Sequence, residues 1–373
     1  MATEISPDGR ALRLGRRQRA LAQMQAHHID ILVLGRQANV RYVTGAPQLW
    51  IGGTRPFAPV CVIVGATGEI FLNSTADEGI PEEIGRDRLY GLAWNPMTLI
   101  SVLKNIDGAS EARRVGTDAL SPTFGTLLPM AFPNAELVDG EVVMRTARRI
   151  KTPDEVAAMD TALCVAEAGV AAAVAELQPG LSEKTLAGAV LEAMAAGGVS
   201  TPATQDAAWV TSREHPWRRA TGDGQVRSGD LVAFAAGALA DGYVAEVGRT
   251  WPAGEVEDGS TRKLYQRSNE LWDRLISACR PGARARDLLA AYDLAGEPLP
   301  PMAVAHGVGL GFDPPVISRE LPATAESENL DPGMVLALTG YVWQEGIGAV
   351  LRRDTVLITD SGPEVLTASP VWK

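Results

Sequence analysis

Histidine is rare in this chain, and two of the four histidines stand where they could do chemistry. His27 and His28 end a stretch typical of a surface helix, whereas His215 precedes a predicted strand pair and His306 opens the sequence His-Gly-Val-Gly. An imidazole exchanges a proton near neutral pH and therefore suits general acid–base catalysis. We expect His215 as the first catalytic candidate and His306 as the second, with Glu246 as an acidic partner. The alternative for His306 is that it only packs within a tight strand.

The composition predicts a globular protein of two domains, with 373 residues, 46% hydrophobic residues and a net charge of -11. The acidic balance disfavours nucleic acid and anionic membrane surfaces as partners. No run of about 20 apolar residues and no secretion signal are evident, so we expect a cytoplasmic protein without a membrane partner. Cys61, Cys164 and Cys279 lack metal-type spacing and cannot all pair, which indicates reduced thiols.

The first half of the chain has the pattern of a small α/β domain. Residues 11–28 are amphipathic at helical spacing, and residues 31–34 form a short apolar run typical of a buried strand. Residues 59–64 and 69–72 flank Ala-Thr-Gly and predict a hairpin.

The second half begins with a clear helix start. Thr152 can cap the helix, Pro153 fits its first turn, and Glu155 completes a capping box. Further helices are predicted at residues 261–279 and 285–295. Because single helices lie between strand pairs, the pattern favours an α+β class over a Rossmann array. We place the two domains at residues 1–148 and 149–373.

Six short motifs follow one another along the second half. They are Arg149-Ile150-Lys151-Thr152, Gly229-Asp230-Leu231-Val232, Asp241-Gly242-Tyr243 with Arg249-Thr250, His306-Gly307-Val308-Gly309, Gly333-Met334-Val335 and Asp354-Thr355-Val356-Leu357. In this order they resemble the creatinase/prolidase/aminopeptidase P superfamily, and residues 39–45 are similar to its N-terminal domain. The resemblance implies a creatinase-type α/β domain followed by a pita-bread domain.

Metallopeptidases of this superfamily bind two divalent ions with two aspartates, one histidine and two glutamates. Matched position by position, this chain keeps the histidine as His306 and has Ala235, Glu246, Thr339 and Arg353 at the other positions. A guanidinium among would-be ligands repels a cation. These departures from the superfamily's ligand set therefore predict no metal and no other cofactor. Arg353 would form an ion pair with Glu246 or bind an anionic group of the substrate. The alternative is an ion pair that fills an inactive site and has no function.

The resemblance also places the segment around His215 at the mouth of the site, and in creatinase, which works without metal, such a histidine is the base. The substrate-binding candidates are Arg353, Trp217, Arg218, Tyr341, Trp50 and Arg55. In the superfamily the N-terminal domain of one subunit covers the site of its neighbour. We therefore expect a homodimer in which Trp50 and Arg55 act in trans.

Three functions remain open. The first is a metal-free hydrolase or lyase that cleaves a C–N or related bond in a small polar or peptide-like substrate by histidine acid–base chemistry. The second is a non-catalytic pseudopeptidase that binds a peptide or protein. The third is a metal-dependent Xaa-Pro peptidase with a displaced ligand set, for which Asp241, Glu345 and Asp354 would join Glu246 and His306.

Overall fold

The structure is a computed structural model, and the chain divides into two compact units, Met1–Arg148 and Arg149–Lys373. Three of the substrate-binding candidates, Trp50, Arg55 and Arg218, lie outside the described residues. The described ranges are 9–46, 60–74, 79–91, 95–119, 121–199, 202–204, 207–217, 219–220, 224–256, 259–320 and 328–373.

The N-terminal unit is built on a six-stranded sheet in the order β4-β3-β2-β1-β5-β6. β1 pairs antiparallel with β2 and parallel with β5, and the predicted hairpin is confirmed as β2 and β3. Its elements are α1 (Gly9–Ala26), β1 (Ile31–Leu34), α2 (Gln37–Thr44), β2 (Cys61–Val64), β3 (Ile70–Asn73), η1 (Arg86–Arg88), β4 (Leu89–Tyr90), α3 (Pro96–Lys104), β5 (Arg114–Thr117), α4 (Pro122–Ala131), β6 (Glu136–Asp139) and α5 (Glu141–Arg149).

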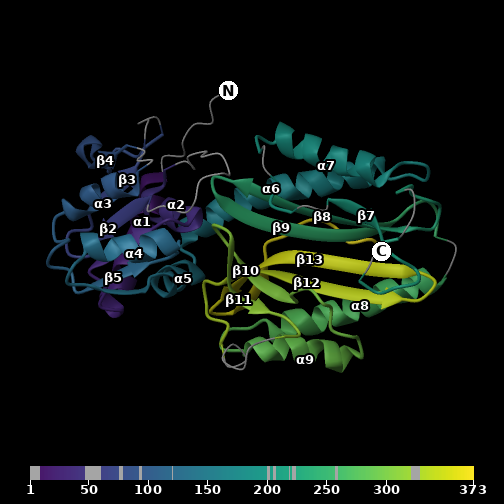
Figure 1. The fold of residues 1–373 in the computed structure, drawn as a ribbon. Helices are drawn as coiled ribbons and strands as arrows, with labels where there is room; N and C mark the ends of the chain where they lie inside the picture. The colour runs from purple at the N-terminus through teal and green to yellow at the C-terminus, as the bar shows by residue number, and fades with distance from the viewer. Residues whose placement is uncertain are drawn as a thin grey trace. The chain divides into compact units, whose positions relative to one another are not determined.

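The C-terminal unit is built on an eight-stranded antiparallel sheet, in which β11-β10-β12-β13-β9-β8-β7 are neighbours and β14 pairs with β13 (Figure 1). The mixture of helices and an antiparallel sheet gives the α+β class. The elements are α6 (Pro153–Glu176), α7 (Glu183–Ala196), β7 (Ala208–Val210), β8 (Leu231–Ala240), β9 (Tyr243–Pro252), α8 (Gly259–Ala278), α9 (Ala285–Ala295), β10 (Ala305–Val308), β11 (Phe312–Ile317), β12 (Val335–Gln344), β13 (Gly348–Thr359) and β14 (Gly362–Val365).

The strand register brings positions from four strands onto one face of this sheet. β8 and β9 are joined by the two-residue turn Asp241-Gly242, whose φ angles of 48° and 86° match the twist of a hairpin. Ala235 of β8 lies opposite Gly248 of β9, Gly248 opposite Arg353 of β13, and Arg353 opposite Thr339 of β12. Directly opposed residues point to the same face, so these side chains share one surface.

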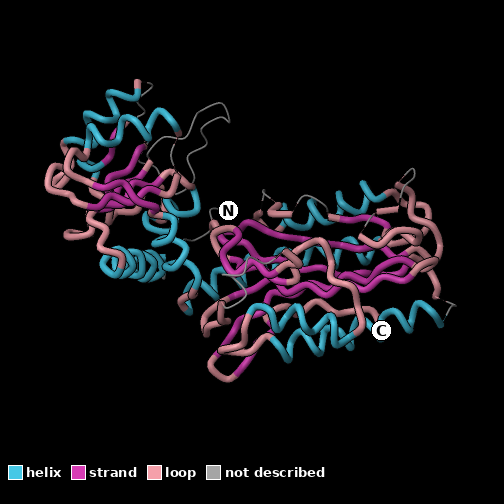
Figure 2. The backbone as a smooth tube through the Cα atoms, turned by 60° about the horizontal axis from the view of Figure 1, so that its bottom comes forward, coloured by secondary structure: helices cyan, strands magenta, loops and turns pink. Residues whose placement is uncertain are grey.

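The helices cover the other face. α6 packs on β8 and β9 and α7 packs on α6 and β7, while α8 packs along β12 and β13 and α9 packs along β11 (Figures 1 and 2). Phe234 of β8 belongs to the first apolar core and Leu336 of β12 to the second, and both alternate with residues of the opposite face. The predicted helices near residues 261–279 and 285–295 are confirmed as α8 and α9. The face that bears Arg353 is thus left uncovered by these helices.

Helix α6 begins where the sequence predicts. The Thr152 side chain accepts a hydrogen bond from the backbone N–H of Glu155, whose carboxylate accepts one from the backbone N–H of Thr152. By length and composition alone α6 is apolar enough to cross a membrane, although acidic residues interrupt its apolar sequence. In the structure α6 buries Leu163 and Val170 against the sheet, as a core helix does.

Candidate functional site

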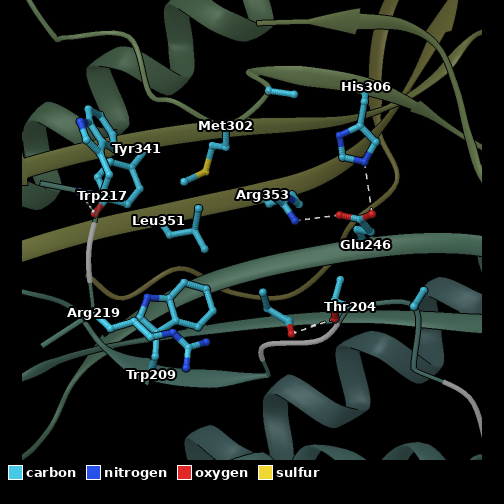
Figure 3. A pocket seen from close by; sticks show the side chains of 13 residues that line it. Thr204, Trp209, Trp217, Arg219, Glu246, Met302, His306, Tyr341, Leu351 and Arg353 are labelled. Carbon is cyan, nitrogen blue, oxygen red and sulfur yellow. Dashed lines mark hydrogen bonds and ion pairs between the residues drawn. The ribbon is translucent and has the colours of Figure 1, made fainter. Parts of the chain in front are cut away.

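A cavity of about 620 Å³ opens on the uncovered face of the C-terminal sheet (Figure 3). Its walls come from six strands, β7, β8, β9, β10, β12 and β13, and from the segments before β7, after β7 and before β10. The aromatic side chains of Trp217 and Tyr341 lie at one end, and His306 and Glu246 lie at the other, with Arg353 beside them. The cavity is therefore apolar at one end and charged at the other.

The charged end is a continuous chain of hydrogen bonds. The His306 Nε2 atom lies 3.2 Å from Glu246 Oε1, and Arg353 Nη1 donates to Glu246 Oε2 at 2.7 Å. Arg353 Nε donates to Thr339 Oγ1 at 2.9 Å. The Glu246 residue is only 1% exposed, so its ionised carboxylate depends on these two partners.

The backbone around Glu246 is fixed from β13. The Thr355 hydroxyl donates to the Glu246 carbonyl at 2.9 Å and accepts from the Glu246 backbone N–H at 3.3 Å. This pair of bonds links β9 to β13 two residues from Arg353. The carboxylate is therefore held at a defined depth in the cavity.

Electrostatics keep Glu246 ionised. Burial raises the pKa of this carboxyl, but the hydrogen bond with His306 and the charge of Arg353 outweigh burial and leave the pKa below its ordinary value. An ionised carboxylate only accepts hydrogen bonds, so His306 Nε2 must carry the proton between them. The second ring nitrogen, Nδ1, is then the ring atom of His306 that does not bond to Glu246.

The apolar end contains two aromatic rings that contact each other at a tilt of 39°. The rings of Trp217 and Tyr341 lie 4.5 Å apart, and the Trp217 backbone N–H donates to the Tyr341 hydroxyl at 3.3 Å. Burial raises the pKa of Tyr341 to about 12, so its phenol is neutral at physiological pH. Arg219 lies over the ring of Trp209 at 5.4 Å, and Met302 lines the wall between the two ends.

The structure brings together most of the site residues expected from the sequence. His306, Glu246, Arg353, Trp217 and Tyr341 all line the cavity, and the expected Glu246–Arg353 ion pair is confirmed. The first-ranked histidine does not join them.

His215 is exposed on the loop after β7 and is not part of the cavity wall. Its backbone N–H donates to the Ser212 hydroxyl at 3.1 Å, and this hydrogen bond links the two residues within the loop. The superfamily resemblance placed this histidine near the mouth but does not determine the direction of its side chain. His306 is therefore the better candidate for acid–base chemistry.

Sequence reasoning missed Trp209, Arg219 and Met302. A signal existed for Trp209, because Ala208 and Val210 are the apolar neighbours that pack on the helix side. In a strand, the residue between two such neighbours faces the opposite side. Trp209 therefore had to face the cavity once Ala208–Val210 was taken as a strand.

The site does not fit the two-ion centre that the superfamily resemblance implies. Ala235 has no ligand atom, the Thr339 hydroxyl is engaged by Arg353, and the Arg353 guanidinium lies among the remaining positions. Across the described ranges, no group of three or more His, Cys, Asp or Glu side chains is arranged to bind a metal ion. Hard divalent cations need several oxygen ligands, which these residues do not supply.

The displaced ligand set does not assemble either. Asp241 is exposed at the hairpin turn, and Glu345 is exposed in the turn after β12. Asp354 is fully buried and pairs with Arg249 at 2.6 Å and with Arg352 at 3.0 Å, on the face of β13 opposite to Arg353. None of the three carboxylates lines the cavity.

Comparison with known proteins identifies the family. The profile of metallopeptidase family M24 matches residues 157–360, and that of the creatinase/prolidase N-terminal domain matches residues 16–150. An Xaa-Pro dipeptidase of Pyrococcus furiosus is 28% identical over 60% of this chain and 65% of that protein. An Xaa-Pro dipeptidase of Pyrococcus horikoshii is 25% identical over 92% of this chain and 94% of its own length.

An uncharacterised hydrolase/peptidase of Sinorhizobium fredii is 26% identical over 93% of this chain and 92% of its own length. Among solved structures, the prolidase from Pyrococcus horikoshii OT3 superposes with a TM-score of 0.78 at 22% identity, covering 95% of this chain and 99% of that one. This likeness shows a shared fold. The M24 match covers more than half of the chain. The chain therefore belongs to metallopeptidase family M24, in the creatinase/prolidase/aminopeptidase P superfamily of pita-bread hydrolases.

Proposed function

We propose that this protein is a metal-independent hydrolase that cleaves a C–N bond in a small substrate. The observation that carries the proposal is the hydrogen-bonded chain Arg353–Glu246–His306 at the charged end of the cavity. It pairs a base with an ionised carboxylate and a permanent positive charge. These are the groups that hydrolysis needs for moving a proton and for holding an anionic substrate.

The chemistry follows from the bonding of each group. His306 Nδ1 removes a proton from a water molecule as the water oxygen attacks the substrate. Glu246 accepts a hydrogen bond from Nε2 and stabilises the imidazolium that forms. The imidazolium then returns the proton to the departing nitrogen. Arg353, which cannot lose its charge, holds an anionic group of the substrate.

The comparisons support hydrolysis over elimination, because the relatives are named as dipeptidases or as a hydrolase/peptidase. They give no support to a lyase. The names of these relatives also favour a second candidate, a metal-dependent Xaa-Pro dipeptidase. Against it stand the side chains at Ala235, Thr339 and Arg353, which offer a divalent ion no carboxylate.

The test compares amide turnover by chelator-treated protein with turnover after addition of manganese, cobalt or zinc. A metal-independent hydrolase keeps its rate after chelation, loses at least about 100-fold in kcat with His306→Asn, and is little changed by His215→Asn, the matched control. Activity that appears only with metal, on Xaa-Pro dipeptides, would overturn the proposal in favour of the second candidate. Equal turnover by both histidine variants and the unmodified protein would also contradict it.

A further inference from the structure

The cavity has a fixed polarity that restricts what can bind. Trp209, Trp217 and Tyr341 form the apolar end, and Met302 and Leu351 continue it toward Arg353 (Figure 3). A ligand that fills about 620 Å³ must place an apolar group against the rings and a polar group near the charged end. The ligand is therefore amphipathic.

Arg353 has hydrogen-bonding capacity left for a ligand. A guanidinium carries five N–H donors, and Arg353 uses one on Nε for Thr339 and one on Nη1 for Glu246. Its side chain is 16% exposed, and it lines the cavity. The remaining donors, on Nη1 and Nη2, have the fork geometry that binds a carboxylate. The charged end therefore selects an anion.

The same end has no carboxylate left to pair with an ammonium. Glu246 is the acidic residue among the described residues that line the cavity, and its two oxygens are engaged by His306 and Arg353. It is 1% exposed, so a ligand ammonium cannot approach it. Arg219, over Trp209, adds a further positive charge near the apolar end. A free α-amino group on the ligand would be repelled without compensation.

We propose that the substrate is an N-acyl amino acid with an aromatic or large apolar acyl group, and that Arg353 binds its carboxylate. This inference rests on the proposed hydrolysis and adds the substrate class. The water oxygen bonds to the acyl carbon, the C–N bond breaks, and the nitrogen receives the proton that His306 took from water. The products are a carboxylic acid and a free amino acid.

Three matched ligands test the class by calorimetry with the chelator-treated His306→Asn variant, which does not turn them over. Phenylpropanoylglycine carries the carboxylate and no ammonium. Phenylpropanoylglycinamide lacks the carboxylate, and phenylalanylglycine adds the ammonium. We expect the first ligand to bind at least about tenfold more tightly than either of the others, as the loss of a charge-assisted hydrogen bond requires.

Two arginine variants locate the contact. Arg353→Lys keeps a positive charge beside Glu246 but lacks the fork, so the preference for the carboxylate over the carboxamide should fall about tenfold. Arg274→Gln, at an exposed arginine of α8 outside the cavity wall, should keep the full preference. If Arg353→Lys does not fold, the binding of the three ligands to the His306→Asn variant still tests the substrate class. Equal binding of the acid and its carboxamide would overturn the inference.

The outcomes separate the substrate class from the reaction. Carboxylate-dependent binding without hydrolysis by the unmodified, metal-free protein would support the ligand class and contradict the proposed function. Hydrolysis of the carboxamide or of the dipeptide at the rate of the acid would support hydrolysis and overturn the ligand class. Hydrolysis of phenylpropanoylglycine alone, with the binding order above, would support both.

Discussion

At the scale of single residues, Arg353 supplies a positive charge at a place where the superfamily resemblance implies metal ligands. The guanidinium satisfies Glu246 much as a cation would, because both neutralise a buried carboxylate. A guanidinium has no vacant coordination position and cannot bind and activate water as a Lewis acid does. In the hydrolysis that we propose, an imidazole activates the water instead, and His306 is the one hydrogen-bonded to the same carboxylate.

The first prediction concerns the dependence of Glu246 on Arg353. Arg353→Met should lower the free energy of unfolding by about 3–5 kcal/mol, because it leaves a buried carboxylate without its charged partner. Adding Glu246→Leu should recover most of this loss, since an apolar pair no longer contains an uncompensated charge. Denaturant unfolding of both variants measures the effect. A double variant as unstable as the single one would contradict this account of the pair.

The second prediction concerns pH. Because the folded-state pKa of Glu246 is below its ordinary value, this group contributes stability above the unfolded-state pKa and loses the contribution as pH falls through the folded-state value. Glu246→Gln should therefore lower the free energy of unfolding by about 1–3 kcal/mol at pH 7. The gap from the unmodified protein should shrink as pH falls below about 4. If urea unfolding shows that the difference in free energy of unfolding between the two proteins grows as pH falls, the predicted direction is wrong.

At the scale of elements, local signals predicted the parts of the fold that depend on neighbours in sequence. The capping box of α6, the β2–β3 hairpin and helices α8 and α9 follow from caps, turns and periodicity. The Glu246–Arg353 pair was predicted through the family motifs. The placement of Arg219 over Trp209 was not predicted, because it depends on how the segment after β7 folds back beside that strand.

The third prediction tests how closely β9 and β13 must approach. A Cβ added at Gly248 would lie 2.9 Å from the Arg353 Cβ, so Gly248→Ala forces the strands or the arginine to shift. We expect a loss of about 1–3 kcal/mol in the free energy of unfolding, together with weaker ligand binding.

Gly340→Ala on β12 is the matched control. Its added Cβ would meet its nearest neighbours at an ordinary 3.7 Å, on the helix-covered side. If thermal unfolding and calorimetry show the same loss of stability and of ligand affinity for both substitutions, the close contact with Arg353 does not explain the effect of Gly248→Ala.

At the scale of the whole molecule, the chain retains the fold of its family while the side chains at its site depart from the ligand set that the resemblance implies. The C-terminal sheet and its helix pairs match the prolidase fold over nearly the full chain. The positions that change, such as Ala235 and Thr339, lie on the uncovered face and not in the cores under the helices. A fold can be kept by its cores while one face is rebuilt for another reaction, so the family alone does not fix the activity.

The last prediction concerns assembly. The superfamily resemblance implies a homodimer in which Arg55 of one subunit completes the site that contains His306 of the other. Arg55→Ala and His306→Asn should each abolish turnover when assayed alone. After the two variants are mixed, unfolded and refolded together, random pairing makes about half of the dimers mixed, and each mixed dimer holds one intact site. About a quarter of the original activity should return, with light scattering reporting the mass of a dimer. If activity does not return although mixed dimers form, Arg55 acts within its own subunit or has no part in the site.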